Sequence, residues 1–147
     1  MGVSSPETLR RSVPSLSGFT ILVVEDDSDS RNLLRDVLQS RGATVLEAEE
    51  VLTAQQYLRT LKVDLVVTDL ALPGRDGVSL LNWLRSQPHD RGGAVPAVAV
   101  TAYDKRYPPG DLSGWAAYFR KPLDLDELVR TIAAILRPPG TVPPDRR

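Results

Sequence analysis

Short apolar runs alternate with amphipathic stretches along most of the chain. The runs cover residues 20–24, 43–46, 63–68, 95–101 and 116–119, and several of them are apolar without a period of two. A strand that is covered on both faces has this continuous apolar pattern, whereas a strand with one solvated face alternates. The pattern therefore predicts five strands, most of them buried.

Two amphipathic helices are expected after the first two runs. The first has Ser28 or Asp29 as its N-cap and Gly42 as its stop. The second places apolar residues at positions i, i+3, i+4 and i+7 across 54–61, but the residues before it are poor caps. Its start is therefore less well defined by the sequence than its apolar face.

Two further helices are expected after the third and fifth runs. One follows Asp76 and ends before Pro88, because the residue that precedes a proline is disfavoured in the helical region. The other begins at Asp124, which has the capping-box spacing to Glu127, and keeps its apolar residues on one side. A strand-helix alternation of this kind predicts an α/β domain with a parallel sheet.

The stretch between the fourth and fifth runs is a poor helix. It contains Pro108, Pro109 and Gly110 where the middle of a helix is expected. A proline inside a helix costs about 3 kcal/mol because it removes a hydrogen bond and clashes with the preceding turn. The sequence therefore predicts a fourth helix that is short, irregular or absent.

Both ends of the chain have few residues that could enter a core. Residues 1–18 mix Ser, Pro and Arg, and residues 138–147 are rich in proline. Such segments bury too little apolar surface to offset the entropy of ordering. We expect a flexible N-terminal extension over 1–18, one domain over 19–137 and a proline-rich tail over 138–147.

Composition excludes several classes of protein. The chain has 147 residues, 18 Lys and Arg against 19 Asp and Glu, a formal charge of −1 and no cysteine. A near-neutral surface lacks the basic footprint of a nucleic-acid or anionic-membrane partner, and no disulfide or thiolate site is possible. No apolar run reaches the ~20 residues of a membrane span, so we expect a cytoplasmic protein.

Charged and hydroxyl side chains follow the predicted strands where each strand ends. Glu25 and Asp26 follow the first run, Asp69 the third, Thr101 closes the fourth and Lys121 follows the fifth. The carboxyl ends of parallel strands meet at one edge of a sheet, where such folds bind ligands. We expect these five side chains to converge there.

Three gathered carboxylates need a compensating cation. Mg²⁺ prefers oxygen ligands and is commonly held by one or two carboxylates together with phosphate oxygens. A carboxylate can then be the nucleophile that forms an aspartyl phosphate, while Lys121 and Thr101 supply a point charge and a hydroxyl to the phosphoryl oxygens. The set of residues predicts a phosphoryl-transfer site.

The chain resembles the receiver domain of two-component response regulators, the CheY-like family. The resemblance rests on four segments that occur in order at residues 21–27, 64–77, 98–102 and 118–122. It implies a flavodoxin-like fold: a five-stranded parallel sheet in the order 2-1-3-4-5 with helices on both faces.

The resemblance also implies a role for each acidic residue. Asp69 matches the phospho-acceptor, Asp26 the direct Mg²⁺ ligand and Glu25 the acid that reaches the metal through water. Ala71 stands where the family supplies a backbone carbonyl to the metal.

The switch positions of the family are matched as well. Thr101 matches the hydroxyl that follows the phosphoryl group, Lys121 the cation, and Tyr118 the aromatic side chain that turns inward when Thr101 moves. The bond before Pro122 is expected to be cis.

The resemblance implies a phosphorylatable receiver that is not an enzyme beyond Mg²⁺-dependent self-phosphorylation and autodephosphorylation. Its partners would be a histidine kinase or histidine phosphotransfer protein and an unknown downstream protein. Two alternatives remain. An aspartate-nucleophile phosphatase would want a second acid where Ala71 stands, and a phosphorylation-independent interaction module normally lacks the acid, Thr or Lys, none of which is missing here.

Overall fold

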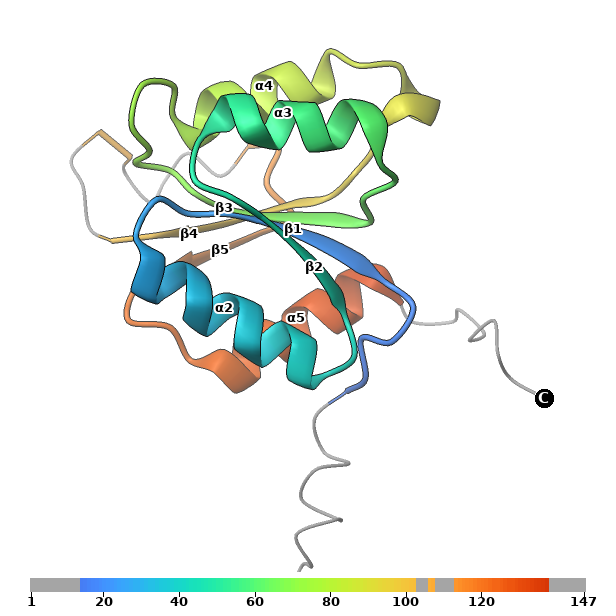
Figure 1. The fold of residues 1–147 in the computed structure, drawn as a ribbon, viewed down its shortest axis with the longest axis vertical. Helices are drawn as coiled ribbons and strands as arrows, with labels where there is room; N and C mark the ends of the chain where they lie inside the picture. The colour runs from blue at the N-terminus through green and yellow to red at the C-terminus, as the bar shows by residue number, and fades with distance from the viewer. Residues whose placement is uncertain (1–13, 103–105, 108–112, 138–147) are drawn as a thin grey trace, which may run out of the picture.

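A five-stranded parallel sheet forms the centre of the protein (Figure 1). The computed structural model describes residues 14–102, 106–107 and 113–137. The strands follow the order β2-β1-β3-β4-β5, which confirms the predicted order 2-1-3-4-5. Their bounds are β1 Thr20–Val24, β2 Thr44–Ala48, β3 Leu65–Asp69, β4 Ala97–Thr101 and β5 Ala117–Arg120.

Two helices cover each face of the sheet (Figure 1). On one face lie α2, Ser28–Ser40, and α5, Leu125–Leu136; on the other lie α3, Val51–Thr60, and α4, Gly77–Arg85, which is followed by the short 3-10 helix η1, His89–Arg91. Successive strand residues pack into the two layers. Val23 joins the core with α2 and α5, whereas Leu22 and Val24 join the core with α3 and α4.

The central strands explain the continuous apolar runs. Every residue of β3 and β4 is buried, and so are four of the five residues of β1, whereas the edge strands β2 and β5 are partly exposed. The prediction of five strands is confirmed: the bounds of β1 agree, and those of the other strands differ by at most two residues. At β3, Asp64 lies in a bend just before the strand, and its carboxylate accepts a hydrogen bond from the Thr20 backbone N–H at 2.8 Å.

Aspartate side chains cap the starts of three of the four α-helices in the described residues, whereas α3 begins after Glu50 without a side-chain cap, as predicted. Asp76 and Asp124 cap α4 and α5 as predicted, since each accepts from the backbone N–H three residues ahead at 2.8 and 3.1 Å. The predicted cap of α2 was wrong. Asp27, and neither Ser28 nor Asp29, is the N-cap, because its carboxylate accepts from the Ser30 N–H at 2.9 Å.

The folded domain also begins before residue 19, where the sequence pattern predicted its start. Leu16 lies inside the predicted extension 1–18, but its side chain is fully buried in the core with α2 and α5. Its backbone N–H donates to the Arg41 carbonyl at 2.7 Å, and Arg137 Nη1 donates to the Ser15 carbonyl at 3.0 Å. A single leucine among Pro, Ser and Gly has no periodicity, so the sequence pattern could not reveal this anchor.

The remaining predictions about the flanks and the fourth helix lie outside the described residues. Residues 1–13, 108–110 and 138–147 belong to this set. Among the residues between β4 and β5 that the structure does describe, none is helical. No helix in the described parts is long and apolar enough to cross a membrane.

Candidate functional site

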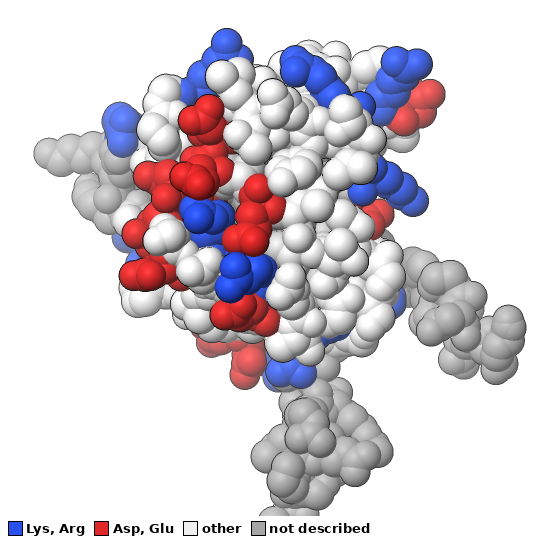
Figure 2. Space-filling view, viewed as in Figure 1, with Lys and Arg blue, Asp and Glu red and all other residues white. Residues whose placement is uncertain are grey.

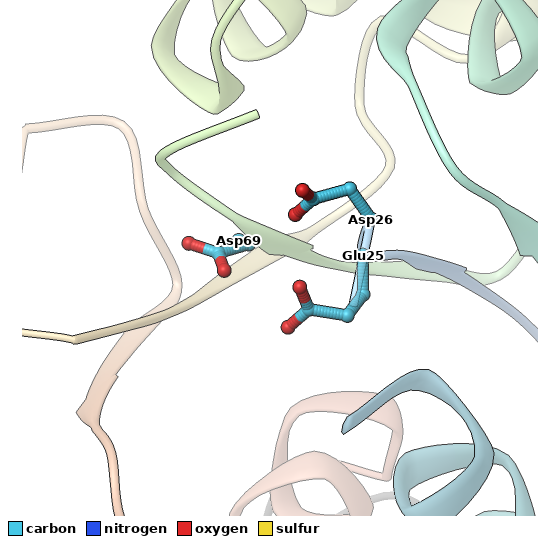
Figure 3. Close-up of side chains that lie close together, drawn as sticks. All are labelled: Glu25, Asp26 and Asp69. Carbon is cyan, nitrogen blue, oxygen red and sulfur yellow. The ribbon is translucent and has the colours of Figure 1, made fainter. Parts of the chain in front are cut away.

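Three carboxylates meet at the carboxyl edge of the sheet (Figure 3). Glu25 and Asp26 directly follow β1, and Asp69 is the last residue of β3. These two strands are neighbours in register, so their ends lie side by side. One carboxylate oxygen from each residue lies within 4.8 Å of the others, as the sequence predicted.

Lys121 joins two of these carboxylates. It follows β5, and its Nζ lies 2.6 Å from Glu25 Oε1 and 3.0 Å from Asp69 Oδ2. Glu25 is 1% and Asp69 6% exposed, whereas Asp26 is exposed to solvent. The site therefore combines a largely buried ion cluster of Glu25, Asp69 and Lys121 with the solvent-exposed carboxylate of Asp26.

Burial and charge act on the ionisation of the cluster. Burial raises the pKa of Glu25, the hydrogen bond from Lys121 works against this shift, and the charge of Asp69 adds to it. Burial also acts to lower the pKa of Lys121, but its hydrogen bonds to both carboxylates outweigh this and the pKa is raised. Lys121 therefore stays charged at neutral pH.

The donor set fits a divalent cation of the Mg²⁺ type. When ionised, the three carboxylates carry three negative charges and Lys121 carries one positive charge. The cluster then has a net charge of −2, which a divalent metal ion would neutralise. All the donors are oxygen atoms, which is the preference of Mg²⁺. Glu25, Asp26 and Asp69 are the residues that would hold it, and an exposed Asp26 leaves room for water ligands.

The loop after β3 holds the backbone and side chain of Asp69. Its Oδ1 accepts from the Ala71 N–H at 3.0 Å, so the Ala71 backbone lies beside the Asp69 carboxylate. The role of the Ala71 carbonyl as a metal ligand stays a prediction. The Leu70 carbonyl accepts from the Gly77 N–H at 2.9 Å. A Cβ on Gly77 would lie 2.4 Å from the Asp69 carbonyl oxygen, so the start of α4 packs directly against the Asp69 backbone.

The side chains expected to respond to a phosphoryl group lie toward β5. Thr101 is buried at the end of β4, and its hydroxyl donates to the Ala102 carbonyl at 3.2 Å. Tyr118 is half-buried on β5, and its hydroxyl donates to the Tyr107 carbonyl at 3.4 Å. Their predicted roles toward a phosphoryl group require both hydroxyls to leave these partners.

The Lys121 backbone is fixed as well as its side chain. The Lys121 N–H donates to the Thr101 carbonyl at 2.8 Å. The peptide bond between Lys121 and Pro122 is cis, the isomer that the resemblance implies.

Three residues of the site region were missed by the sequence reasoning. Gly77 served only as a marker of the helix start. Arg31 donates from Nη1 to the Glu25 carbonyl at 2.9 Å. The sequence could have pointed to it, because a basic residue is unusual so close to the start of a helix. Tyr107 donates its hydroxyl to Asp76 Oδ2, the α4 cap, at 2.9 Å, a contact between distant residues that no local pattern predicts.

Known proteins are similar to this chain in sequence or in fold. The chain is 38% identical over 120 residues to an uncharacterised 14.6 kDa protein of Leptolyngbya boryana, covering 80% of this chain and 90% of the relative. It is 28% identical over 122 residues to the polar-differentiation response regulator DivK of Brucella anthropi, covering 80% and 95%. A putative response regulator of Chloroflexus aurantiacus superposes with a TM-score of 0.70 at 30% identity, covering 80% and 97% of the two chains.

The family model of the response regulator receiver domain matches residues 21–133. This span begins in β1 and ends in α5, so it contains the whole sheet except Thr20, and every residue of the acidic cluster. The chain therefore belongs to the receiver domain family of two-component response regulators.

Proposed function

We propose that this receiver is a phosphorylation switch in which Asp69 accepts a phosphoryl group from a histidine kinase or a histidine phosphotransfer protein. The observation that supports this most directly is the position of Asp69. Its carboxylate lies at the edge of the sheet close to two other carboxylates and contacts the ammonium group of Lys121. Receiver domains typically bind Mg²⁺ at such an acidic pocket.

The transfer is a displacement at phosphorus. A carboxylate oxygen of Asp69 forms the new O–P bond, the P–N bond of the phosphohistidine breaks, and its electron pair stays on the imidazole. Mg²⁺, when bound by Glu25, Asp26 and Asp69, offsets negative charge on the phosphoryl oxygens. The hydrogen bond from Ala71 N–H to Asp69 Oδ1 holds the carboxylate in a fixed orientation for the attack.

The added phosphoryl group carries up to about two negative charges, which changes the contacts of the neighbouring residues. Lys121 exchanges a carboxylate oxygen for a phosphoryl oxygen, and the Thr101 hydroxyl turns from the Ala102 carbonyl toward the same group. Tyr118 then fills the space beside β4. Because these contacts exist only in the phosphorylated state, they shift the population toward a different surface around β4 and β5 for a downstream protein.

No catalytic activity beyond Mg²⁺-dependent self-phosphorylation and autodephosphorylation is part of this proposal. The test is labelling with acetyl phosphate, followed by intact mass spectrometry. Asp69→Asn is expected to take up no phosphoryl group, whereas Asp90→Asn, which alters an exposed aspartate on η1, is expected to label like the wild type. Equal labelling of Asp69→Asn and the wild type would refute the assignment of the acceptor.

A further inference from the structure

Arg31 is an unusual residue for its place in the fold. It lies at the end of the first turn of α2, where the helix dipole favours acidic side chains and disfavours cations. Only 14% of its side chain is exposed, and a guanidinium group that is removed from water needs partners. Its partners therefore indicate why a basic residue occupies this position.

The guanidinium group of Arg31 connects the ends of two strands. Nη1 donates to the Glu25 carbonyl at 2.9 Å, Nε lies 3.5 Å from Glu47 Oε1, and Nη2 lies 4.0 Å from Glu49 Oε2. Figure 2 shows this region on the left of the view, where acidic side chains surround basic ones over the start of α2 and the end of β2. A planar group with several fixed donors is suited to such a bridge.

The carbonyl of Glu25 belongs to the peptide plane that leads into Asp26. This plane is rigid, so fixing the carbonyl oxygen fixes the direction in which the chain enters Asp26. The rest of Glu25 is also fixed, because its N–H donates to the Ala48 carbonyl at 2.9 Å and its carboxylate contacts Lys121. Asp26 itself is exposed, so its position depends on the backbone that carries it.

We propose that Arg31 is a positioning residue for the divalent-cation site: it orients the peptide between Glu25 and Asp26 and so places the Asp26 carboxylate for the metal. This inference rests on the part of the proposed function in which Glu25, Asp26 and Asp69 hold Mg²⁺. Arg31 does not touch the metal. It acts through the backbone.

The sign of the effect separates this role from a simple effect of charge. Arg31 is a cation beside an acidic site, so removing its charge makes the site more negative and, by charge alone, tightens Mg²⁺ binding. Loss of the positioning contact weakens Mg²⁺ binding instead. Residues that orient metal ligands typically contribute about 10–100-fold to metal affinity.

The experiment measures the Mg²⁺ dissociation constant of the unphosphorylated full chain by isothermal titration calorimetry at fixed pH and ionic strength. Arg31→Met is expected to bind Mg²⁺ roughly tenfold more weakly than the wild type. Arg31→Lys keeps the charge but lacks the planar guanidinium group with its several fixed donors, and it is expected to weaken Mg²⁺ binding as well.

Arg35→Met is the matched control. Arg35 lies on the next turn of α2, and its Nη1 is 3.6 Å from the same Glu47, while its other contacts are with Asp36 and Asn32 rather than with Glu25. Its replacement removes the same charge and is expected to leave Mg²⁺ binding unchanged or slightly tighter.

Unchanged or tighter binding by Arg31→Met would overturn the inference. Circular dichroism in EDTA checks that the variant is folded; if Arg31→Met does not fold, Arg31→Lys decides, and wild-type affinity in that variant counts against the inference. Normal binding by the wild type together with unaffected Arg31 variants contradicts only this inference. A wild type that binds no Mg²⁺ contradicts both this inference and the cation part of the proposed function.

Discussion

Replacement of Lys121 by Met tests the ion cluster directly. Lys121 Nζ lies 2.6 Å from Glu25 Oε1 and 3.0 Å from Asp69 Oδ2, and both carboxyl groups are buried, so the variant leaves two like charges facing each other out of water. Removing one partner of a fully buried ion pair costs about 3–5 kcal/mol. Because 24% of the Lys121 side chain is exposed, we expect a smaller loss of unfolding free energy, about 2–3 kcal/mol in the absence of metal.

The measurement is urea unfolding in excess EDTA at neutral pH, followed by tryptophan fluorescence and supported by thermal melts. A loss of this size lowers the Tm by roughly 6–12 °C in a domain of this length. Added Mg²⁺ is expected to restore part of the lost stability, because a cation again faces the carboxylates and binds more tightly without the competing ammonium group. Lys62→Met, which alters an exposed lysine, is the matched control.

A Lys121→Met variant that is as stable as the wild type in EDTA would refute this reasoning. It would mean that the two carboxylates are compensated by water or by protonation, and that the short contacts to Lys121 add nothing to the stability of the metal-free state.

Two further substitutions test how the site is supported. Gly77→Ala places a Cβ 2.4 Å from the Asp69 carbonyl oxygen and is expected to cost about 1–3 kcal/mol in urea unfolding and to slow labelling by acetyl phosphate; a variant that matches the wild type in both would show that α4 can move away freely. Asp124→Ala removes the side-chain acceptor of the Glu127 N–H and is expected to cost about 1 kcal/mol by the same assay, with labelling retained; an unchanged unfolding midpoint would contradict its role as the cap of α5.

The strands and their order could be predicted because the sequence carries their physical signature. Strands that are covered on both faces must be apolar throughout, and this pattern marked β1, β3 and β4. The convergence of the acidic residues followed from the same pattern, since parallel strands end at one edge. The cap of α2 did not follow, because Asp27, Ser28 and Asp29 are all capable caps and only the folded geometry selects one.

Other features of the site depend on contacts between distant residues. Arg31 reaches Glu25, Glu47 and Glu49 only after α2 has packed beside the ends of β1 and β2. Leu16 was missed because one apolar residue in a polar segment gives no period to detect.

The central position of β3 has a mechanical consequence for signalling. The strand that ends in Asp69 is hydrogen-bonded to a neighbour on each side and is covered above and below, so on our proposal its backbone has little freedom to yield when a phosphoryl group is attached to Asp69. The strain of accommodating that anion must be relieved elsewhere. It falls on the partly exposed edge strand β5 and on the end of β4, where among the described residues the hydroxyls of Thr101 and Tyr118 each donate one hydrogen bond that is easily exchanged.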